Sequence, residues 1–271
     1  MADGGGFTGR RKQRRMKPLH LGLRASLAAF IVWLALTVGG SLGKTSGAHE
    51  ALWESASRGL GWPWLLAAMF ATGLVLFSDR RALGMRLPVT IATLRLAWLP
   101  FLYAVAACLL AAAQPPPAAL AGMVLLNTSL VALSEEVMFR GILLYGLMTR
   151  LPVLPAVLVS SALFGAVHAL NVFTTGDLAA SLLQALAAAL QGVGLAAVRV
   201  RTHSLWPMIV VHAFYDCGLL LAAGAHPATA MPGAMSVLPV LFVLPIFVYG
   251  LFLLRKNALR PDPLPALERS F

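Results

Sequence analysis

The sequence has few charged residues, and acidic residues are the scarcest. Only 11% of its 271 residues are charged, ten of them Asp or Glu, and 59% are hydrophobic. Because a soluble domain is about a quarter charged, this composition, with a mean hydropathy of +0.81, excludes a water-soluble globular protein and a disordered one. Cysteine is also scarce. The two cysteines, Cys108 and Cys217, lie in apolar segments, so we infer no disulfide and no redox motif.

Long segments without Asp, Glu, Lys or Arg occupy most of the chain and indicate membrane spans. A spanning helix needs about 20 mainly apolar residues. The strands of a membrane barrel would alternate in polarity, which these segments do not. We therefore predict an all-α, polytopic transmembrane helix bundle with eight helices, near residues 23–42, 62–78, 92–113, 118–150, 152–170, 178–198, 204–223 and 235–254.

The positive charges indicate how this bundle lies in the membrane. With the N-terminus in the cytoplasm, eight helices place 19 of the 21 Lys and Arg residues on the cytoplasmic side, and only Lys44 and Arg58 on the other. This is the positive-inside bias of membrane proteins. It accounts for the net charge of +11 without a nucleic-acid partner, and it predicts that both termini are cytoplasmic. We expect the lipid bilayer as the surrounding medium, and the Ala- and Arg-rich usage suggests a bacterial inner (cytoplasmic) membrane.

The distribution of polar residues predicts four regions along the chain. We expect a basic cytoplasmic tail, three N-terminal transmembrane helices, a group of four further transmembrane helices, and a last transmembrane helix with a cytoplasmic tail. Their expected boundaries are 1–21, 22–117, 118–225 and 226–271.

The few polar groups at membrane depth are the candidates for chemistry. A charged residue at the centre of a spanning helix costs about 2.5–3.5 kcal/mol on the insertion scale and usually faces an interior cavity. These groups must therefore pair with one another, with water or with a metal ion. They are Glu135, Glu136, Arg140, His168, His212 and Asp216.

Their spacing predicts which of them meet within one helix. Glu136 and Arg140 are four residues apart and share a helix face, so they can form an ion pair. Phe164 and His168 have the same spacing in the next helix, as do His212 and Asp216 in the seventh. Glu135 is rotated by about 100° from Glu136 and points elsewhere.

A hairpin between the fourth and fifth helices would bring Glu135 and His168 to the same height. Glu135 precedes Leu151 by 16 residues, and His168 follows Pro152 by 16. His212 lies about 12 Å into a helix that begins on the cytoplasmic side. We therefore expect all three groups in one layer, in the cytoplasmic half of the bilayer.

Two carboxylates and two imidazoles in one apolar cavity suit the activation of water. We expect Glu135 to act as a general base and His168 to orient the same water molecule. His212 and Asp216 could stabilise an oxyanion or hold a cation, and Arg140 would hold Glu136. The predicted reaction is hydrolysis, most plausibly of an amide.

Three motifs in the same region resemble those of a known family. Residues Glu135–Gly141 read EEVMFRG, Phe164–His168 read FGAVH and His212–Asp216 read HAFYD. They resemble the EExxxRG, FxxxH and HxxxN/D motifs of the CPBP family, which comprises type 2 CAAX prenyl endopeptidases, bacterial Abi proteins and their bacteriocin-immunity relatives. The resemblance covers roughly residues 118–225 and implies that these four helices form the catalytic core.

This resemblance implies a glutamic-type intramembrane endopeptidase that opens towards the cytosol. It assigns Glu135 and His168 to water activation and the pair His212 and Asp216 to transition-state stabilisation, with Glu136, Arg140 and Phe164 in support. We expect no cofactor. The alternative is a zinc enzyme with His168, His212 and Asp216 as ligands, since catalytic zinc keeps three protein ligands and one open position.

Two other function classes compete with the enzyme. A relative with the same fold could act by binding alone, as a membrane immunity or scaffold protein that sequesters a peptide or a partner. A transporter could use the buried carboxylates for proton coupling, but the sequence shows no inverted repeat or paired broken helices. For the enzyme we expect a membrane-associated or C-terminally anchored protein or peptide as substrate, and the sequence does not name it.

Overall fold

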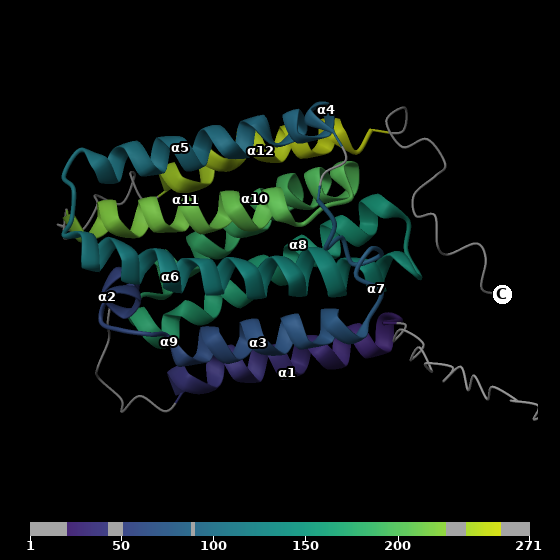
Figure 1. The fold of residues 1–271 in the computed structure, drawn as a ribbon, viewed down its shortest axis with the longest axis horizontal. Coiled ribbons are helices and arrows are strands. Elements are labelled where there is room, and N and C mark those ends of the chain that lie inside the picture. Colours follow the sequence, from purple (N-terminus) through teal and green to yellow (C-terminus); the bar gives the residue numbers. More distant parts are fainter. Residues whose placement is uncertain (1–20, 43–50, 88–89, 226–236, 256–271) are drawn as a thin grey trace, which may run out of the picture.

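The computed structural model describes residues 21–42, 51–87, 90–225 and 237–255. In this part of the chain the regular secondary structure is helical, and the helices run nearly parallel to the long axis of the molecule (Figure 1). The basic run at residues 10–15 and the end of the chain after residue 255 lie outside the described residues. The elements are α1 (Leu23–Leu42), α2 (Leu52–Ser57), α3 (Trp62–Phe77), α4 (Ile91–Leu94), η1 (Arg95–Ala97), α5 (Trp98–Ala112), α6 (Ala118–Glu135), η2 (Glu136–Leu143), α7 (Leu144–Met148), α8 (Val153–His168), η3 (Ala169–Asn171), α9 (Val172–Thr175), α10 (Leu178–Thr202), α11 (Trp206–Ala225) and α12 (Leu238–Leu253).

The long helical segments follow the predicted spans. Five of them are long and apolar enough to cross a membrane: Ile91–Ala112, Ala118–Met148, Val153–Thr175, Leu178–Thr202 and Trp206–Ala225. Three shorter apolar helices lie at 23–39, 62–77 and 238–253. The prediction of an all-α membrane bundle is confirmed, and the chain is an integral membrane protein. The count of eight spans and the cytoplasmic termini stay predictions.

The structure differs from the predicted helices in three places. The short helix α2 lies in a segment that we expected to be a loop. The fifth helix continues past His168 through the 3₁₀ turn η3 and α9, as far as Thr175. The fourth helix changes from α to π geometry at Glu136 and returns to α at Leu144. Apolar length and charge determine where helices run, but they carry no signal for such a change within a helix.

Two ends of the bundle can be told apart by their loops. The basic end carries the loop Ser78–Leu87, the turn at Arg150 and the α10–α11 connection. There the backbone N–H of Leu205 donates to the carbonyl of Gly84 (2.9 Å), and Nη2 of Arg199 donates to the carbonyl of Ala82 (3.0 Å). The far end carries α2, the α5–α6 connection and the turn between α9 and α10 (Figure 1).

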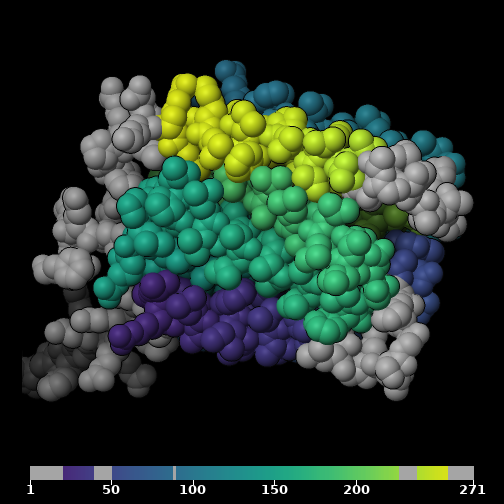
Figure 2. All heavy atoms as spheres, turned by 180° about the vertical axis from the view of Figure 1, so that it is seen from behind, coloured from purple at the N-terminus to yellow at the C-terminus, as the bar shows by residue number. Residues whose placement is uncertain are grey.

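Small residues let the helices around α10 approach closely. A Cβ atom on Gly194 of α10 would lie 2.7 Å from the carbonyl oxygen of Ile246 in α12, and one on Gly165 of α8 would lie 2.7 Å from Cβ of Ala189 in α10. Such contacts between small residues are typical of membrane helix packing. Figure 2 shows the resulting surface, with α1 (purple) along one edge, α12 (yellow) along the opposite edge and residues of α8 to α10 between them.

Candidate active site

The first motif begins where the fourth helix becomes a π-helix. Residues Glu136–Leu143 form η2, and the carbonyl of Phe139 accepts the N–H of Leu144, five residues on. The same carbonyl accepts the hydroxyl of Ser160 from α8, at 2.8 Å. Short π-helical segments within α-helices occur frequently at functional sites. All residues of η2 are buried, so this segment forms the centre of the bundle.

The imidazole of His212 lies among three carboxylates. Its Nδ1 is 2.9 Å from Oε1 of Glu136, and its Nε2 is 3.2 Å from Oδ2 of Asp216 and 3.7 Å from Oε2 of Glu135. Glu135 and Glu136 point in different directions, as their adjacent positions on a helix predict. Their carboxylates nevertheless lie near the same imidazole ring, one at each nitrogen. His212 joins the first and third motifs into one cluster.

Glu136 and Arg140 form a buried ion pair, as their spacing predicts. Nη1 of Arg140 lies 3.1 Å from Oε1 of Glu136, and the two side chains are 1% and 0% exposed. The guanidinium carbon lies 3.8 Å from the centre of the Phe164 ring, a cation–π contact that helps to compensate for lost hydration. Phe164 therefore links the arginine of the first motif to the second motif.

These contacts restrict where protons can lie on His212. Glu136 is paired with Arg140 and, as a carboxylate, only accepts hydrogen bonds. Nδ1 of His212 is therefore the donor in its contact with Glu136. On the other side of the ring, 3.2 Å between Nε2 and Asp216 requires a proton on one of the two atoms. The cluster can thus hold a proton and pass it between Nε2 and the carboxyl groups that face it.

His168 is held by a hydrogen bond to the backbone of its own helix. Its Nδ1 lies 2.8 Å from the carbonyl of Phe164, and a carbonyl only accepts, so Nδ1 is the donor. In the neutral ring, Nε2 is then an acceptor, as a base requires. Its ring also packs edge-on against Phe164, with 4.7 Å between the ring centres.

One large cavity contains all four predicted catalytic side chains. Glu135, His168, His212 and Asp216 line a space of about 1100 Å³. Glu135 is 14% exposed, and Asp216 is 31% exposed. Deep pockets that bind drug-sized ligands usually measure about 300–1,000 Å³, so this cavity is large enough for a short peptide segment. Phe164 also lines the cavity, whereas Glu136 and Arg140 do not.

The cavity extends from the middle of the bundle towards its far end. Glu135 lies near the middle of its long helix, and His168 lies closer to Thr175, at the far end, than to Val153. None of the described residues of the basic-end loops lines the cavity, whereas α2 and the turn before α10 do. The cavity therefore lies nearer the far end than the basic end of the described bundle, and the side of the membrane to which it opens stays a prediction.

Sequence reasoning missed two features of the site. It treated Glu136 only as the partner of Arg140, whereas Glu136 also contacts His212. It also missed the amide side chains of the cavity. Asn171 and Gln184 are hydrogen-bonded at 2.9 Å, and Gln191 lines the cavity as well. The seven-residue spacing of Gln184 and Gln191, which places them on one helix face, was the available signal.

The donor set offers little to a metal ion. Among the described residues, no three His, Cys, Asp or Glu side chains form a group that could hold one. Both nitrogens of His212 face carboxylates, and Nδ1 of His168 faces a carbonyl. The alternative zinc ligands His168, His212 and Asp216 share a cavity without forming such a group.

Comparison with known proteins agrees with the three motifs. No curated protein and no solved structure matches the chain. Residues 117–218 match the family described as Rce1-like, type II CAAX prenyl endopeptidase Rce1-like. This segment contains all three motifs and ends two residues beyond Asp216. The predicted resemblance to CPBP endopeptidases is confirmed as a match of residues 117–218 to this family.

Proposed function

We propose that this protein is an intramembrane endopeptidase that hydrolyses a peptide bond in a membrane-associated or C-terminally anchored protein or peptide. The match to an endopeptidase family over residues 117–218 supports a protease of the CAAX type. The observation that carries the proposal is the convergence of Glu135, His168, His212 and Asp216 on one cavity of about 1100 Å³.

In the proposed mechanism, Glu135 and His168 activate a water molecule. Oε2 of Glu135 is buried and has no hydrogen-bond partner among the described residues, so a water or substrate N–H is needed to solvate it. His168 offers Nε2 as a second acceptor. The pair removes a proton as the water oxygen attacks the peptide carbonyl, which is general base catalysis.

His212 and Asp216 would stabilise the resulting oxyanion and return a proton to the leaving amine. A proton held between Nε2 of His212 and Asp216, 3.2 Å apart, is positioned for that transfer. Glu136 and Arg140 act indirectly, because Glu136 holds Nδ1 of His212 at 2.9 Å. We propose that these steps need no metal cofactor.

Cleavage of membrane-anchored peptides tests the proposal. The protein, purified in detergent, is incubated with a library of anchored peptides and compared with Glu135→Gln and His168→Ala. Glu135→Gln keeps the shape of the side chain, so loss of cleavage by this variant with unchanged thermal stability supports the mechanism. The wild-type protein is also assayed with a chelator, which distinguishes the metal-free mechanism from a zinc-dependent one. Loss of wild-type cleavage after chelation would establish zinc dependence instead.

The same experiment distinguishes the endopeptidase function from the alternative of a protein that only binds a peptide. Equal cleavage by the three proteins would disprove the proposed roles of Glu135 and His168. If no protein cleaves but a library peptide co-purifies with all three, the alternative of a membrane immunity or scaffold protein is correct.

A further inference from the structure

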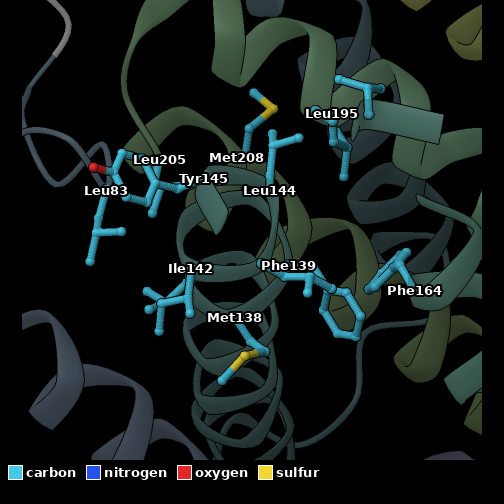
Figure 3. Close-up of a cluster of buried hydrophobic side chains, with 14 of the residues drawn as sticks. Leu83, Met138, Phe139, Ile142, Leu144, Tyr145, Phe164, Leu195, Leu205 and Met208 are labelled. Carbon is cyan, nitrogen blue, oxygen red and sulfur yellow. The ribbon is translucent and has the colours of Figure 1, made fainter. Parts of the chain in front are cut away.

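A layer of packed apolar side chains separates the cavity from the basic end. On η2, the residues after the two glutamates point into this layer, where they meet the start of α11 and the loop between α3 and α4 (Figure 3). Its members are at most 1% exposed: Leu83, Phe139, Ile142, Leu144, Leu205 and Met208.

The layer is tightly packed around Gly141. A Cβ atom added to Gly141 would lie 3.2 Å from Cδ1 of Leu205 and 3.4 Å from the carbonyl oxygen of Leu83. Three elements that are distant in sequence thus meet at van der Waals distance. Protein interiors packed in this way leave few voids larger than a water molecule, and no described residue of the basic-end loops lines the cavity. This packing disfavours the entry of a polypeptide from the basic end.

In the other direction, the cavity extends as far as the far end of the bundle. Its wall includes α2 and the residues before Trp64, Asp177 at the start of α10, and Pro239 in the first turn of α12. These residues belong to the end where α2 and α9 lie in Figure 1. The site is therefore a shaft with a closed floor towards the basic loops and walls that continue towards the opposite face.

The walls of this shaft suit an extended polypeptide. Gln184 and Gln191 of α10 both line it, and Asn171 donates to Gln184 at 2.9 Å. Carboxamides both donate and accept, which matches the alternating N–H and C=O groups of a peptide backbone. Towards the far end the lining includes one basic and one acidic side chain, Arg58 and Asp177.

The basic loops identify the faces of the membrane. Lys and Arg in short loops remain on the cytoplasmic side during insertion, and the loop Ser78–Leu87 alone carries Arg80, Arg81 and Arg86. The far end, with α2, is then the non-cytoplasmic face. Building on the proposed function, we infer that the site receives its substrate from the non-cytoplasmic face, and that the substrate class is an exported or membrane-anchored polypeptide whose cleaved segment lies on that face.

Thiol labelling from each side of the membrane tests this inference without any cleavage assay. Single cysteines are introduced in a Cys108→Ala/Cys217→Ala background at Gln184 in the shaft, at Arg150 as the basic-end control and at Gln114 as the far-end control. Gln114 and Arg150 are exposed. Each variant is produced in a bacterial inner membrane and treated with a membrane-impermeant maleimide, in right-side-out spheroplasts and in inverted vesicles.

We expect Gln184→Cys to behave as Gln114→Cys does. Both are labelled in spheroplasts and lose labelling in inverted vesicles, whereas Arg150→Cys shows the reverse. Labelling of Gln184→Cys together with Arg150→Cys would overturn the inference, as would labelling of Arg150→Cys in spheroplasts. Labelling of Gln184→Cys only after detergent is added would overturn it too, because the shaft would then be closed on both sides. Since no outcome depends on turnover, the inference can fail while the proposed function stands.

Discussion

Glu136 positions His212 by accepting a hydrogen bond from its Nδ1 at 2.9 Å, with the same oxygen that lies 3.1 Å from Arg140. One carboxylate oxygen thus connects a fully buried ion pair to an imidazole that lines the cavity. A carboxylate on Nδ1 selects the tautomer and orientation of a catalytic histidine, and Glu136 is placed to do so here.

Glu136→Gln should reduce kcat with little change in KM. The amide loses the charge that favours a proton on Nδ1, so His212 is no longer held in the required tautomer. We expect kcat to fall by roughly 10²- to 10⁴-fold, the usual contribution of a positioned acid–base group. Steady-state cleavage of the best anchored peptide measures both constants. A rise in KM with unchanged kcat would show instead that Glu136 only shapes the peptide site.

The ion pair of Arg140 with Glu136 predicts a large loss of stability when one partner is removed. Arg140→Met leaves the buried Glu136 without compensation, and breaking such a pair costs about 3–5 kcal/mol. The double variant Arg140→Met/Glu136→Gln should recover most of this loss, because no uncompensated charge stays buried. Thermal midpoints in detergent provide the comparison.

The exposed pair on α2 provides a matched control for this experiment. Nη2 of Arg58 lies 3.2 Å from Oε2 of Glu54 at the same four-residue spacing, but these side chains are 68% and 37% exposed. Glu54→Gln should cost at most about 1 kcal/mol, as is usual for surface pairs. Similar midpoints for Arg140→Met and Glu54→Gln would contradict the argument from burial.

The sequence predicted the partners within each helix and missed those between helices. The pairs Glu136–Arg140 and His212–Asp216 follow from helical periodicity alone, and both are present at 3.1 and 3.2 Å. The contact between Glu136 and His212 spans 76 residues. It depends on the rotation of two helices about their axes, which no local pattern specifies.

The direction of the cavity illustrates the same limit. Equal spacing from the hairpin turn correctly brought Glu135 and His168 to one cavity. It could not reveal that Phe139 and Met208 are fully buried on the basic side of that cavity. Leucine, methionine and phenylalanine face lipid in some positions and fill the interior in others, so hydropathy does not show which side of a polar layer is sealed.

Helix contacts at glycine predict a second stability difference. Gly194→Ala should destabilise the protein because its new Cβ would lie 2.7 Å from the backbone oxygen of Ile246, which forces α10 and α12 apart. Gly73→Ala on α3 is the control, since nothing lies within 4 Å of its Cβ position. There the gain in helix propensity, up to about 1 kcal/mol, should leave the thermal midpoint equal or higher. Equal loss in both variants would indicate that close α10–α12 packing has no special importance.

His203, just beyond the end of α10, predicts a dependence of stability on pH. It adopts a left-handed backbone conformation, with φ of 54°, and its carbonyl accepts Nε of Arg86 at 3.2 Å. Partial burial and the nearby charges of Arg86, Arg199 and Arg201 lower the pKa of His203 below its usual 6.5. Since protonation then favours the unfolded chain, this contribution to stability is complete above about pH 6.5 and decreases as the pH falls through the lowered pKa.

His203→Asn separates this effect from all other titrations. Asparagine tolerates the left-handed conformation at a helix end and does not titrate. Thermal midpoints of the wild type and the variant are measured in detergent from about pH 8 to about pH 5, the range in which histidine changes charge. As the pH falls, the midpoint of the wild type should decrease relative to that of His203→Asn. A difference that stays constant, or changes in favour of the wild type, would mean that the three arginines do not oppose protonation of His203, and that the α10–α11 connection is held by its backbone hydrogen bonds alone.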